Sequence, residues 1–172
     1  MNFEFYILDL IQNIRFNFLD SAMLFITTLG NGGFIWILTG ILMLCFKKTR
    51  KAGITALLAL LIGFLICNIL LKPLVARIRP YEIRDIIPLI PKPSDYSFPS
   101  GHSTSSFAAA TALYMNFKKK SISFIVLAVL IAFSRLYLYV HFPTDIIAGI
   151  IIGILSGILS NKLTKRECKK SL

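Results

Sequence analysis

A chain of 172 residues is long enough for one domain, but its 56% hydrophobic content and mean hydropathy of +0.74 exceed what a soluble globular protein carries. This composition excludes a soluble globule and indicates an integral membrane protein. The net charge of +11 does not indicate a nucleic-acid partner, because the basic residues lie between apolar runs and not along a stripe with interleaved aromatics.

The first predicted element is an N-terminal helix that lies on the membrane surface. Its apolar residues follow helical spacing, and polar or charged side chains occupy the positions between them. The apolar set is Phe3, Tyr6, Ile7, Leu10, Ile11, Ile14 and Phe18. A stretch with this many polar residues is a poor candidate for crossing a bilayer, so we expect an interfacial amphipathic helix.

Six apolar runs follow, at 19–29, 34–46, 52–71, 101–117, 121–138 and 143–160. Residues 52–71 contain no charged side chain over about 20 residues, the length needed to cross a bilayer. Gly-Asn-Gly-Gly at 30–33 separates the first two runs, and a proline-rich loop from Pro80 to Phe98 precedes the fourth. The sequence therefore predicts an all-α fold, a bundle of six transmembrane helices that forms a single domain over residues 1–172.

Basic residues indicate how the predicted bundle is oriented. The segments 47–51, 118–120 and 162–170 hold 12 of the 19 lysines and arginines, and all three fall on one side of the bundle. The positive-inside rule assigns that side, and with it both termini, to the cytoplasm. The opposite side still receives Lys72, Arg77, Arg79, Arg84, Lys92 and Arg135. These charges break the bias and require another explanation.

Lys72 and Arg79 form the first of three polar clusters on that opposite side. They are two helical turns apart at the end of the third run, so both can project from one face into a common pocket. The alternative is that Lys72, Arg77 and Arg79 extend to lipid headgroups, as long basic side chains do at membrane surfaces.

The second cluster is Pro99-Ser100-Gly101-His102, where the fourth run begins. Ser100 can cap the helix, and Gly101 permits a ligand to approach the backbone closely. The N–H groups of the first helical turn then form an anion site beside His102. The alternative is an ordinary N-cap with a histidine at the level of the headgroups.

The third cluster joins the end of the fifth run to the start of the sixth. Arg135 follows Ser134 at the first of these ends, and His141 and Asp145 stand four residues apart at the second. A carboxylate beside an imidazole fixes its tautomer and stabilises its protonated form, which makes the histidine a better nucleophile or base. The alternative is an ion pair at the membrane edge.

Together the clusters indicate a phosphate site. A dianionic group needs several donors, and a transferring phosphoryl group is stabilised mainly by positioned positive charge, which Lys72, Arg79 and Arg135 supply with the helix-start amides. His102 and His141 are the two histidines of the chain, and both fall on this side. They provide a proton donor and a nucleophile.

In their order and spacing, the clusters resemble the three signature motifs of the type 2 phosphatidic acid phosphatase superfamily. Lys72 is followed after six residues by Arg79-Pro80, and Pro99-Ser100-Gly101-His102 comes next. Ser134-Arg135 is followed after five residues by His141, and after three more by Asp145. The six-span layout resembles the membrane lipid phosphatases of that superfamily more than its soluble acid phosphatases or vanadium haloperoxidases.

The resemblance implies a role for each matched residue. His141 attacks phosphorus and forms a phosphohistidine, Asp145 orients it, and His102 protonates the leaving oxygen and later activates water. The other matched positions hold the phosphoryl oxygens, and they are Lys72, Arg79, Ser100, the Gly101 amide and Arg135. The resemblance implies no metal and no cofactor, and the side chains left over are too few to ligate a catalytic cation.

The expected activity is removal of phosphate from a lipid phosphate or diphosphate at the outer face of a bacterial inner membrane. By family resemblance the candidate substrates are undecaprenyl diphosphate, phosphatidylglycerophosphate, phosphatidate and the 1-phosphate of lipid A. The loop 81–96, with Arg84, Lys92 and Tyr96, is the expected place of substrate selection. Two alternatives stay open, a phosphotransferase with the same intermediate and a transporter or scaffold that binds phosphate without cleaving it.

Overall fold

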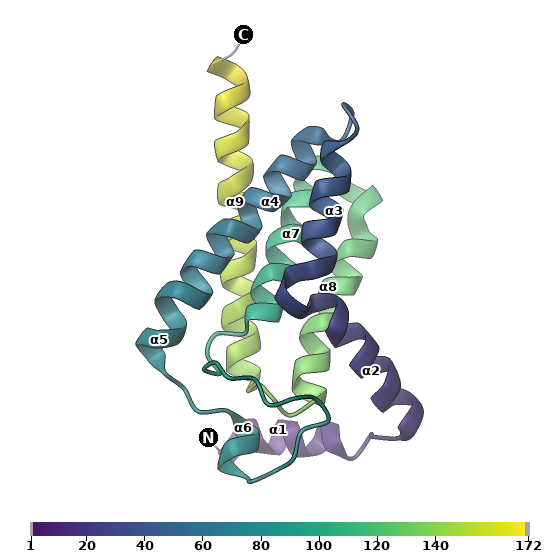
Figure 1. Cartoon of the computed structure of the whole chain (residues 1–172), viewed down its shortest axis with the longest axis vertical. Helices are drawn as coiled ribbons and strands as arrows, with labels where there is room; N and C mark the ends of the chain where they lie inside the picture. Colours follow the sequence, from purple (N-terminus) through teal and green to yellow (C-terminus); the bar gives the residue numbers. More distant parts are fainter. Residues whose placement is uncertain (1, 171–172) are drawn as a thin grey trace.

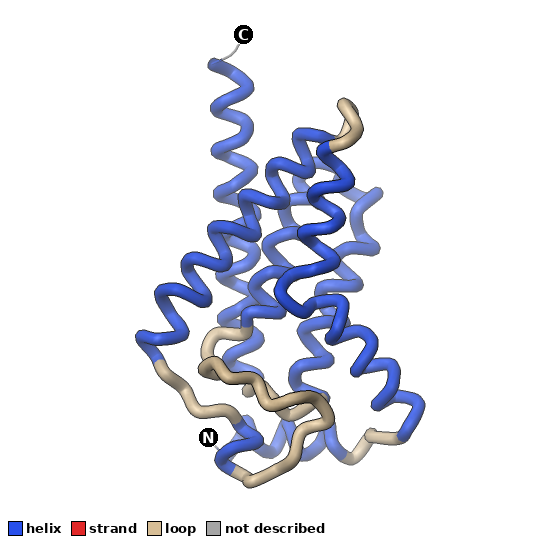
Figure 2. Tube along the Cα trace, in the orientation of Figure 1, coloured by secondary structure: helices blue, strands red, loops and turns tan. Residues whose placement is uncertain are grey.

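The computed structural model describes residues 2–170, and this part of the chain is helical without a strand (Figures 1 and 2). The helices are α1 (Asn2–Gln12), α2 (Asn17–Gly30), α3 (Phe34–Leu44), α4 (Arg50–Phe64), α5 (Lys72–Val75), α6 (Pro80–Ile83), α7 (Gly101–Phe117), α8 (Ile122–Tyr137) and α9 (Pro143–Lys170). A π-helical segment, Leu65–Leu71, joins α4 to α5, and short 3₁₀ turns occupy Asn31–Gly33 and Lys118–Ser121. The predicted all-α fold is confirmed.

Four helical stretches in the described residues are long and apolar enough to cross a membrane, namely Asn17–Leu44, Arg50–Ile83, Gly101–Tyr137 and Pro143–Lys165. The third contains both α7 and α8, which pack side by side (Figure 1). Large apolar side chains such as Phe25, Leu61 and Leu155 are exposed on these stretches. Exposed apolar surface of this extent is typical of helices that face lipid.

Small residues let the central helices approach closely. α7 packs most extensively on α9, and α4 contacts both. Buried alanines line the contact between α4 and α7, among them Ala52, Ala56, Ala59, Ala108 and Ala112. On α9, a Cβ at Gly153 would come within 2.6 Å of the Thr104 carbonyl oxygen, so only glycine permits this approach. The backbones of α7 and α9 therefore touch, which fixes the start of one helix relative to the other.

The turn predicted at 30–33 bends the chain but does not reverse it. Gly32 and Gly33 have φ values of +57° and +72°, and this left-handed backbone kinks the path between α2 and α3. Both helices run toward the same end of the molecule (Figure 1). The runs 19–29 and 34–46 therefore form one broken helix, and the predicted six-span bundle is not confirmed. The four later runs match α4 with its π-helical extension, α7, α8 and α9.

α1 lies across the end of the bundle where α6 is found (Figure 1). Its Phe5 and Leu8 are buried against the α8–α9 connection, and the Phe5 ring meets Phe142 edge to face at 5.3 Å. Phe3 and Tyr6 on the same helix are exposed. The predicted N-terminal helix is present, and one of its faces packs against the α8–α9 connection. Its contact with the membrane surface is untested and stays a prediction.

The basic connections gather at one end of the molecule. The turn between α3 and α4, the turn between α7 and α8, and the last part of α9 all lie opposite α1 and α6 (Figure 1). This grouping matches the expectation for the three basic segments. The expectation that both termini share the cytoplasmic side does not fit, because the broken α2–α3 helix makes one pass where two were predicted.

Candidate active site

The three predicted cations and both histidines line one cavity of about 840 Å³. Lys72 begins α5, Arg79 precedes α6, and Arg135 lies in the last turn of α8. Each of these basic residues is at most 5% exposed. Such burial excludes the alternative in which Lys72 and Arg79 extend to lipid headgroups, because their charges are held inside the protein. The Gly101 backbone, at the start of α7, also lines the cavity.

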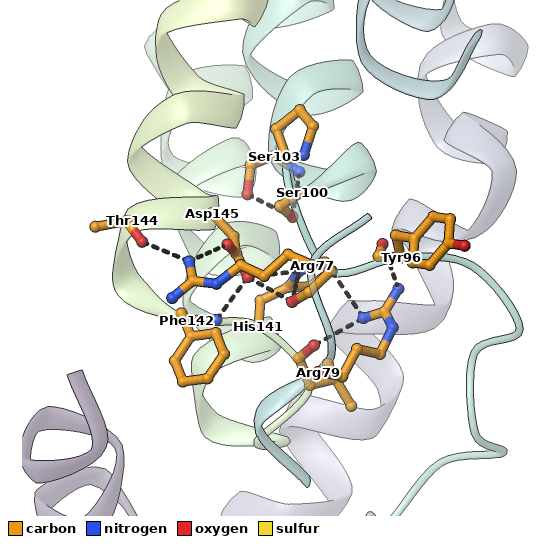
Figure 3. Close-up of polar contacts among 12 residues, drawn as sticks. Arg77, Arg79, Tyr96, Ser100, Ser103, His141, Phe142, Thr144 and Asp145 are labelled. Carbon is orange, nitrogen blue, oxygen red and sulfur yellow. Dashed lines mark hydrogen bonds and ion pairs between the residues drawn. The ribbon is translucent and has the colours of Figure 1, made fainter. Parts of the chain in front are cut away.

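His141 and Asp145 meet at the start of α9 (Figure 3). His141 Nδ1 lies 3.5 Å from Asp145 Oδ2, which also accepts hydrogen bonds from the Ser97 hydroxyl at 2.5 Å and the Phe142 amide at 2.9 Å. Both the imidazole and the carboxylate are fully enclosed by protein. Asp145 Oδ2 is thus held by two donors and faces the ring nitrogen of His141 that points away from the cavity cations. Ser97 was not among the predicted site residues.

The other nitrogen of His141 faces Arg79, whose Nη1 is 3.3 Å from Nε2 and also donates to the Val140 carbonyl at 2.7 Å. A guanidinium can only donate, so Nε2 is the acceptor in this pair. A neutral His141 therefore carries its proton on Nδ1, toward Asp145, and keeps a lone pair on Nε2. Burial lowers the pKa of His141, and the charges of Arg79 and Arg135 lower it further against the opposing hydrogen bond of Asp145. The ring is neutral at physiological pH.

His102 stands in the first turn of α7 and contacts the break between α2 and α3. Its Nε2 lies 3.0 Å from Asn31 Oδ1. The ring packs over Gly30, where a Cβ would come within 2.8 Å of His102 Cδ2. The segment 30–33 was predicted only as a turn, and in the structure it also contacts the imidazole of His102. Nothing in the sequence pattern indicated that contact, because the two segments are far apart along the chain.

Arg135 is an incompletely paired buried cation. Its Nη1 donates to Thr27 Oγ1 at 2.7 Å, and its Nε has no partner among the described residues. Burying a charge is costly unless other groups compensate it. A guanidinium held in this way at a cavity wall is well suited to receive an anion.

Ser100 caps α7 and does not line the cavity. Its hydroxyl accepts from the Ser103 amide at 3.4 Å and the Ser103 hydroxyl at 3.1 Å, and the residue is fully buried (Figure 3). The expected capping role is therefore seen, and direct contact of Ser100 with phosphoryl oxygens stays a prediction. Asp145 likewise lies behind the cavity wall, where it supports His141.

Asp95 was missed by the sequence analysis, yet it is the carboxylate nearest the predicted phosphate donors. It forms ion pairs with Lys72 and, at 2.6 Å, with Arg79 Nη2. Its own side chain is 50% exposed. Although burial raises the pKa of the Asp95 carboxyl, Lys72 and Arg79 outweigh burial and lower the pKa to about 2. A permanently ionised carboxylate thus occupies the position between two buried cations.

The part of the chain that the structure describes holds no group of three or more His, Cys, Asp or Glu side chains arranged for a metal ion. Independence from metals stays a prediction, to be tested by chelation.

Comparisons with known proteins show the family of this chain. A family model described as the PAP2 superfamily matches residues 52–168. An undecaprenyl-diphosphatase of Sulfolobus acidocaldarius is 39% identical over 133 residues, which cover 76% of this chain and 64% of that protein. The crystal structure of Aquifex aeolicus LpxE has a TM-score of 0.81 at 31% identity, covering 92% of this chain and 94% of that one. The transmembrane PAP2 type phosphatidylglycerolphosphate phosphatase from Bacillus subtilis has a TM-score of 0.78 at 31% identity, covering 96% and 86%.

The apolar helices define a multi-pass membrane protein, and its cavity, lined by buried cations, is suited to an anion. The chain belongs to the PAP2 superfamily. It spans less than two thirds of the Sulfolobus relative, so its activity and substrate are argued from its own residues.

Proposed function

We propose that this chain is a membrane lipid phosphatase that acts through a phosphohistidine on His141. The observation that carries the proposal is the arrangement of that imidazole. Nε2 faces the cavity and Arg79 at 3.3 Å, and Nδ1 faces Asp145 at 3.5 Å. A neutral ring in this tautomer presents its lone pair to a phosphoryl group bound by the cations. Its Nδ1–H remains toward a carboxylate, which stabilises the cationic ring formed by phosphorylation.

Two displacements complete the reaction. In the first, His141 Nε2 bonds to phosphorus while the bond from phosphorus to the lipid oxygen breaks, and His102 gives that oxygen a proton. In the second, His102 takes a proton from water, whose oxygen bonds to phosphorus while the P–N bond breaks. Phosphate leaves, and both histidines return to their starting states. Both rings line the same cavity, as the two steps require.

Three groups of donors stabilise the transferring phosphoryl group in this proposal. Lys72 and Arg79 contact it from the α5–α6 side, Arg135 from α8, and the Gly101 amide from the N-terminus of α7. Donors that are positioned before the reaction act on charge developing in the transition state without a reorganisation cost. The burial of all three cations supports this role, because electrostatic interactions are stronger where water is excluded.

A lipid substrate fits the shape of the cavity. The cavity is lined by the three cations and both histidines. On the side of α3 and α4 it is lined by apolar residues, namely Ile37, Leu57, Leu60, Leu61 and Phe64. A phosphate at the cations would place an attached hydrocarbon chain along this wall. We therefore propose an amphiphilic phosphate ester or diphosphate as substrate, from the set of undecaprenyl diphosphate, phosphatidylglycerophosphate, phosphatidate and lipid A 1-phosphate.

The proposed placement is a bacterial cytoplasmic membrane with the site toward the exterior. The basic turns and the last part of α9 lie at the opposite end from α1 and α6 (Figure 1), which the positive-inside rule assigns to the cytoplasm. The chain then crosses five times, through α2–α3, α4–α5, α7, α8 and α9, as one domain. α1 lies at the outer surface, where its exposed Phe3 and Tyr6 can enter the lipid interface.

Purified protein in lipid vesicles is expected to release inorganic phosphate from at least one of the four candidate lipids, and a chelator is expected to leave the rate unchanged. Labelled phosphate recovered on an added alcohol instead of in water would identify a phosphotransferase. Binding of every lipid without release from any of them would identify a scaffold or transporter and overturn the proposal. Loss of activity on chelation, restored by a divalent cation, would overturn metal independence.

Asp95 is expected to compete with the substrate phosphate for Lys72 and Arg79. Replacing it with asparagine removes the charge but keeps the backbone carbonyls of Asp95 and Tyr96 that accept from Arg79 and Lys72. We expect Asp95→Asn to lower the inhibition constant of inorganic phosphate roughly tenfold, or about 1.4 kcal/mol, with KM falling in the same direction. Inhibition assays at fixed pH measure both quantities.

Asp85→Asn is the matched control for this experiment, because Asp85 is an exposed carboxylate in the same loop. It is expected to leave the inhibition constant unchanged. Weaker phosphate inhibition in Asp95→Asn would mean that the carboxylate supports the cations and does not compete with the substrate.

A further inference from the structure

Arg77 lies between the two motif cations in sequence, but the proposed reaction gives it no role. The sequence alone suggested that it extends to lipid headgroups. In the structure its side chain is 23% exposed and turns inward to the start of α9 (Figure 3). Its surroundings are those of a residue that supports the catalytic centre.

The guanidinium of Arg77 is held on three sides. Nη1 donates to Asp145 Oδ1 at 2.6 Å and to Thr144 Oγ1 at 2.7 Å. Nη2 donates to Glu4 Oε2 of α1 at 2.6 Å, and the group stacks over the Phe142 ring at 4.0 Å. Charge-assisted hydrogen bonds of this length, combined with stacking, fix the orientation of a side chain.

The two oxygens of Asp145 therefore have different partners. Oδ2 faces His141 and accepts from Ser97 and Phe142, whereas Oδ1 accepts from Arg77. A cation bound to a carboxylate draws electron density from it and reduces its ability to stabilise a protonated imidazole on its other side. Arg77 thus lies one step behind the pair that controls the nucleophile.

We propose that Arg77 is a positioning residue that sets the basicity of His141 through Asp145, and that Glu4 of α1 tunes it by partly neutralising Arg77. This inference rests on the proposed phosphatase function. Charges alternate along the chain of contacts, from the anion Glu4 to the cation Arg77, the anion Asp145 and the imidazole of His141. A change at either of the first two residues is felt at the nucleophile with a predictable sign.

Other charged and titratable groups also act on this pair and stay in place in the test. They are Arg79 and Lys72 beside the α5–α6 connection, Asp95 of the following loop, His102 of α7 and Arg135 of α8. Since each variant below retains all of them, a shift reports the Glu4–Arg77 pair alone.

The test is the acid limb of the pH profile of kcat/KM, which reports protonation of an essential group in the free enzyme. Arg77→Met keeps an apolar stem over Phe142 but removes a positive charge near His141. The imidazole then binds its proton more tightly, so the acid limb is expected to move about one pH unit upward. Glu4→Gln removes one of the two carboxylates that pair with Arg77, so the limb is expected to move downward. Arg77→Lys retains the charge and is expected to keep the limb near its wild-type position at reduced kcat.

Arg84→Met is the matched control. Arg84 also connects to α1, with Nη2 3.4 Å from Asp9 Oδ2 and its guanidinium 4.5 Å above the Phe5 ring, but it does not contact Asp145. Its removal loosens the same helix and is expected to leave the limb unmoved. If the acid limb does not shift in Arg77→Met, or shifts equally in Arg84→Met, the inference is overturned. Arg77 then only connects α1 to the start of α9.

The remaining outcomes are also decisive. If Arg77→Met does not fold, Glu4→Gln carries the test, and a limb that does not move downward overturns the inference. A wild-type protein that releases no phosphate overturns the proposed function itself, which separates that failure from an unshifted limb in an active enzyme.

Discussion

Replacing His141 with alanine is expected to lower kcat/KM for a lipid phosphate by roughly 10,000-fold or more, because the atom that bonds to phosphorus is lost. Val140 and Phe142, the sequence neighbours of His141, are buried in a cluster with Phe5 and Leu8 of α1, and the substitution leaves this cluster in place. The fold is therefore expected to persist. Phosphate release and a thermal melt of the same preparation measure the two effects.

His102→Ala separates the nucleophile from the proton donor. A prenyl diphosphate has a phosphate leaving group that depends less on protonation, so His141 can still be phosphorylated in this variant while hydrolysis is slow. Substrate labelled at the terminal phosphorus is expected to leave an acid-labile label on His102→Ala protein and none on His141→Ala protein. If His141→Ala protein carries the label, or keeps activity within tenfold of wild type, the nucleophile is another residue.

Arg135→Met is expected to reduce kcat roughly 100- to 1,000-fold, or about 2.7–4 kcal/mol, without reducing the melting temperature. The activity falls because a preorganised donor to the phosphoryl group is removed. Stability is maintained because the variant replaces a buried cation, whose Nε has no partner in the described structure, with an unbranched apolar side chain that needs no partner. Melting curves and initial rates on one preparation measure both.

Arg15→Met is the comparison for this experiment. Arg15 lies in the α1–α2 connection, pairs with Asp20 at 3.1 Å and is 32% exposed, so its loss removes a surface ion pair. It is expected to change activity little. A parallel loss of melting temperature and kcat in Arg135→Met would show that this arginine mainly holds α8 to α2 through Thr27.

The apolar runs were sufficient to predict an all-α membrane protein, because a continuous hydrophobic stretch is a local property of the sequence. The path of the chain at Gly32 and Gly33 is not local. Two glycines indicate that the helix is interrupted, but the angle of the break depends on how α2 packs on α8 and α3 on α4. Those contacts join distant segments, so a sequence pattern does not reveal whether the chain bends or reverses. The prediction of a reversal at 30–33 determined both the predicted number of spans and the membrane side assigned to the N-terminus.

Predicted site residues that stand at helix ends lie together in the fold, and their catalytic roles stay predictions. Lys72, Arg135 and His141 line one cavity because the ends of antiparallel helices gather on one side of a bundle. Residues whose role depends on loop conformation or on distant contacts were missed or misread, and these are Asn31, Arg77, Asp95 and Ser97. Arg77 illustrates the reason. Its sequence position suits a headgroup contact, and only the fold brings Asp145 within 2.6 Å of it.

The close approach of Gly153 to the Thr104 carbonyl fixes α7, which carries His102, against α9, which follows His141. This approach depends on the glycine at position 153, because a Cβ there would meet main-chain atoms of α7. The apolar side chains of α3 and α4 that line the cavity, among them Ile37 and Leu61, are not part of this contact. Substitutions among these apolar residues are therefore expected to change which hydrocarbon chain fits the cavity without moving α7 against α9.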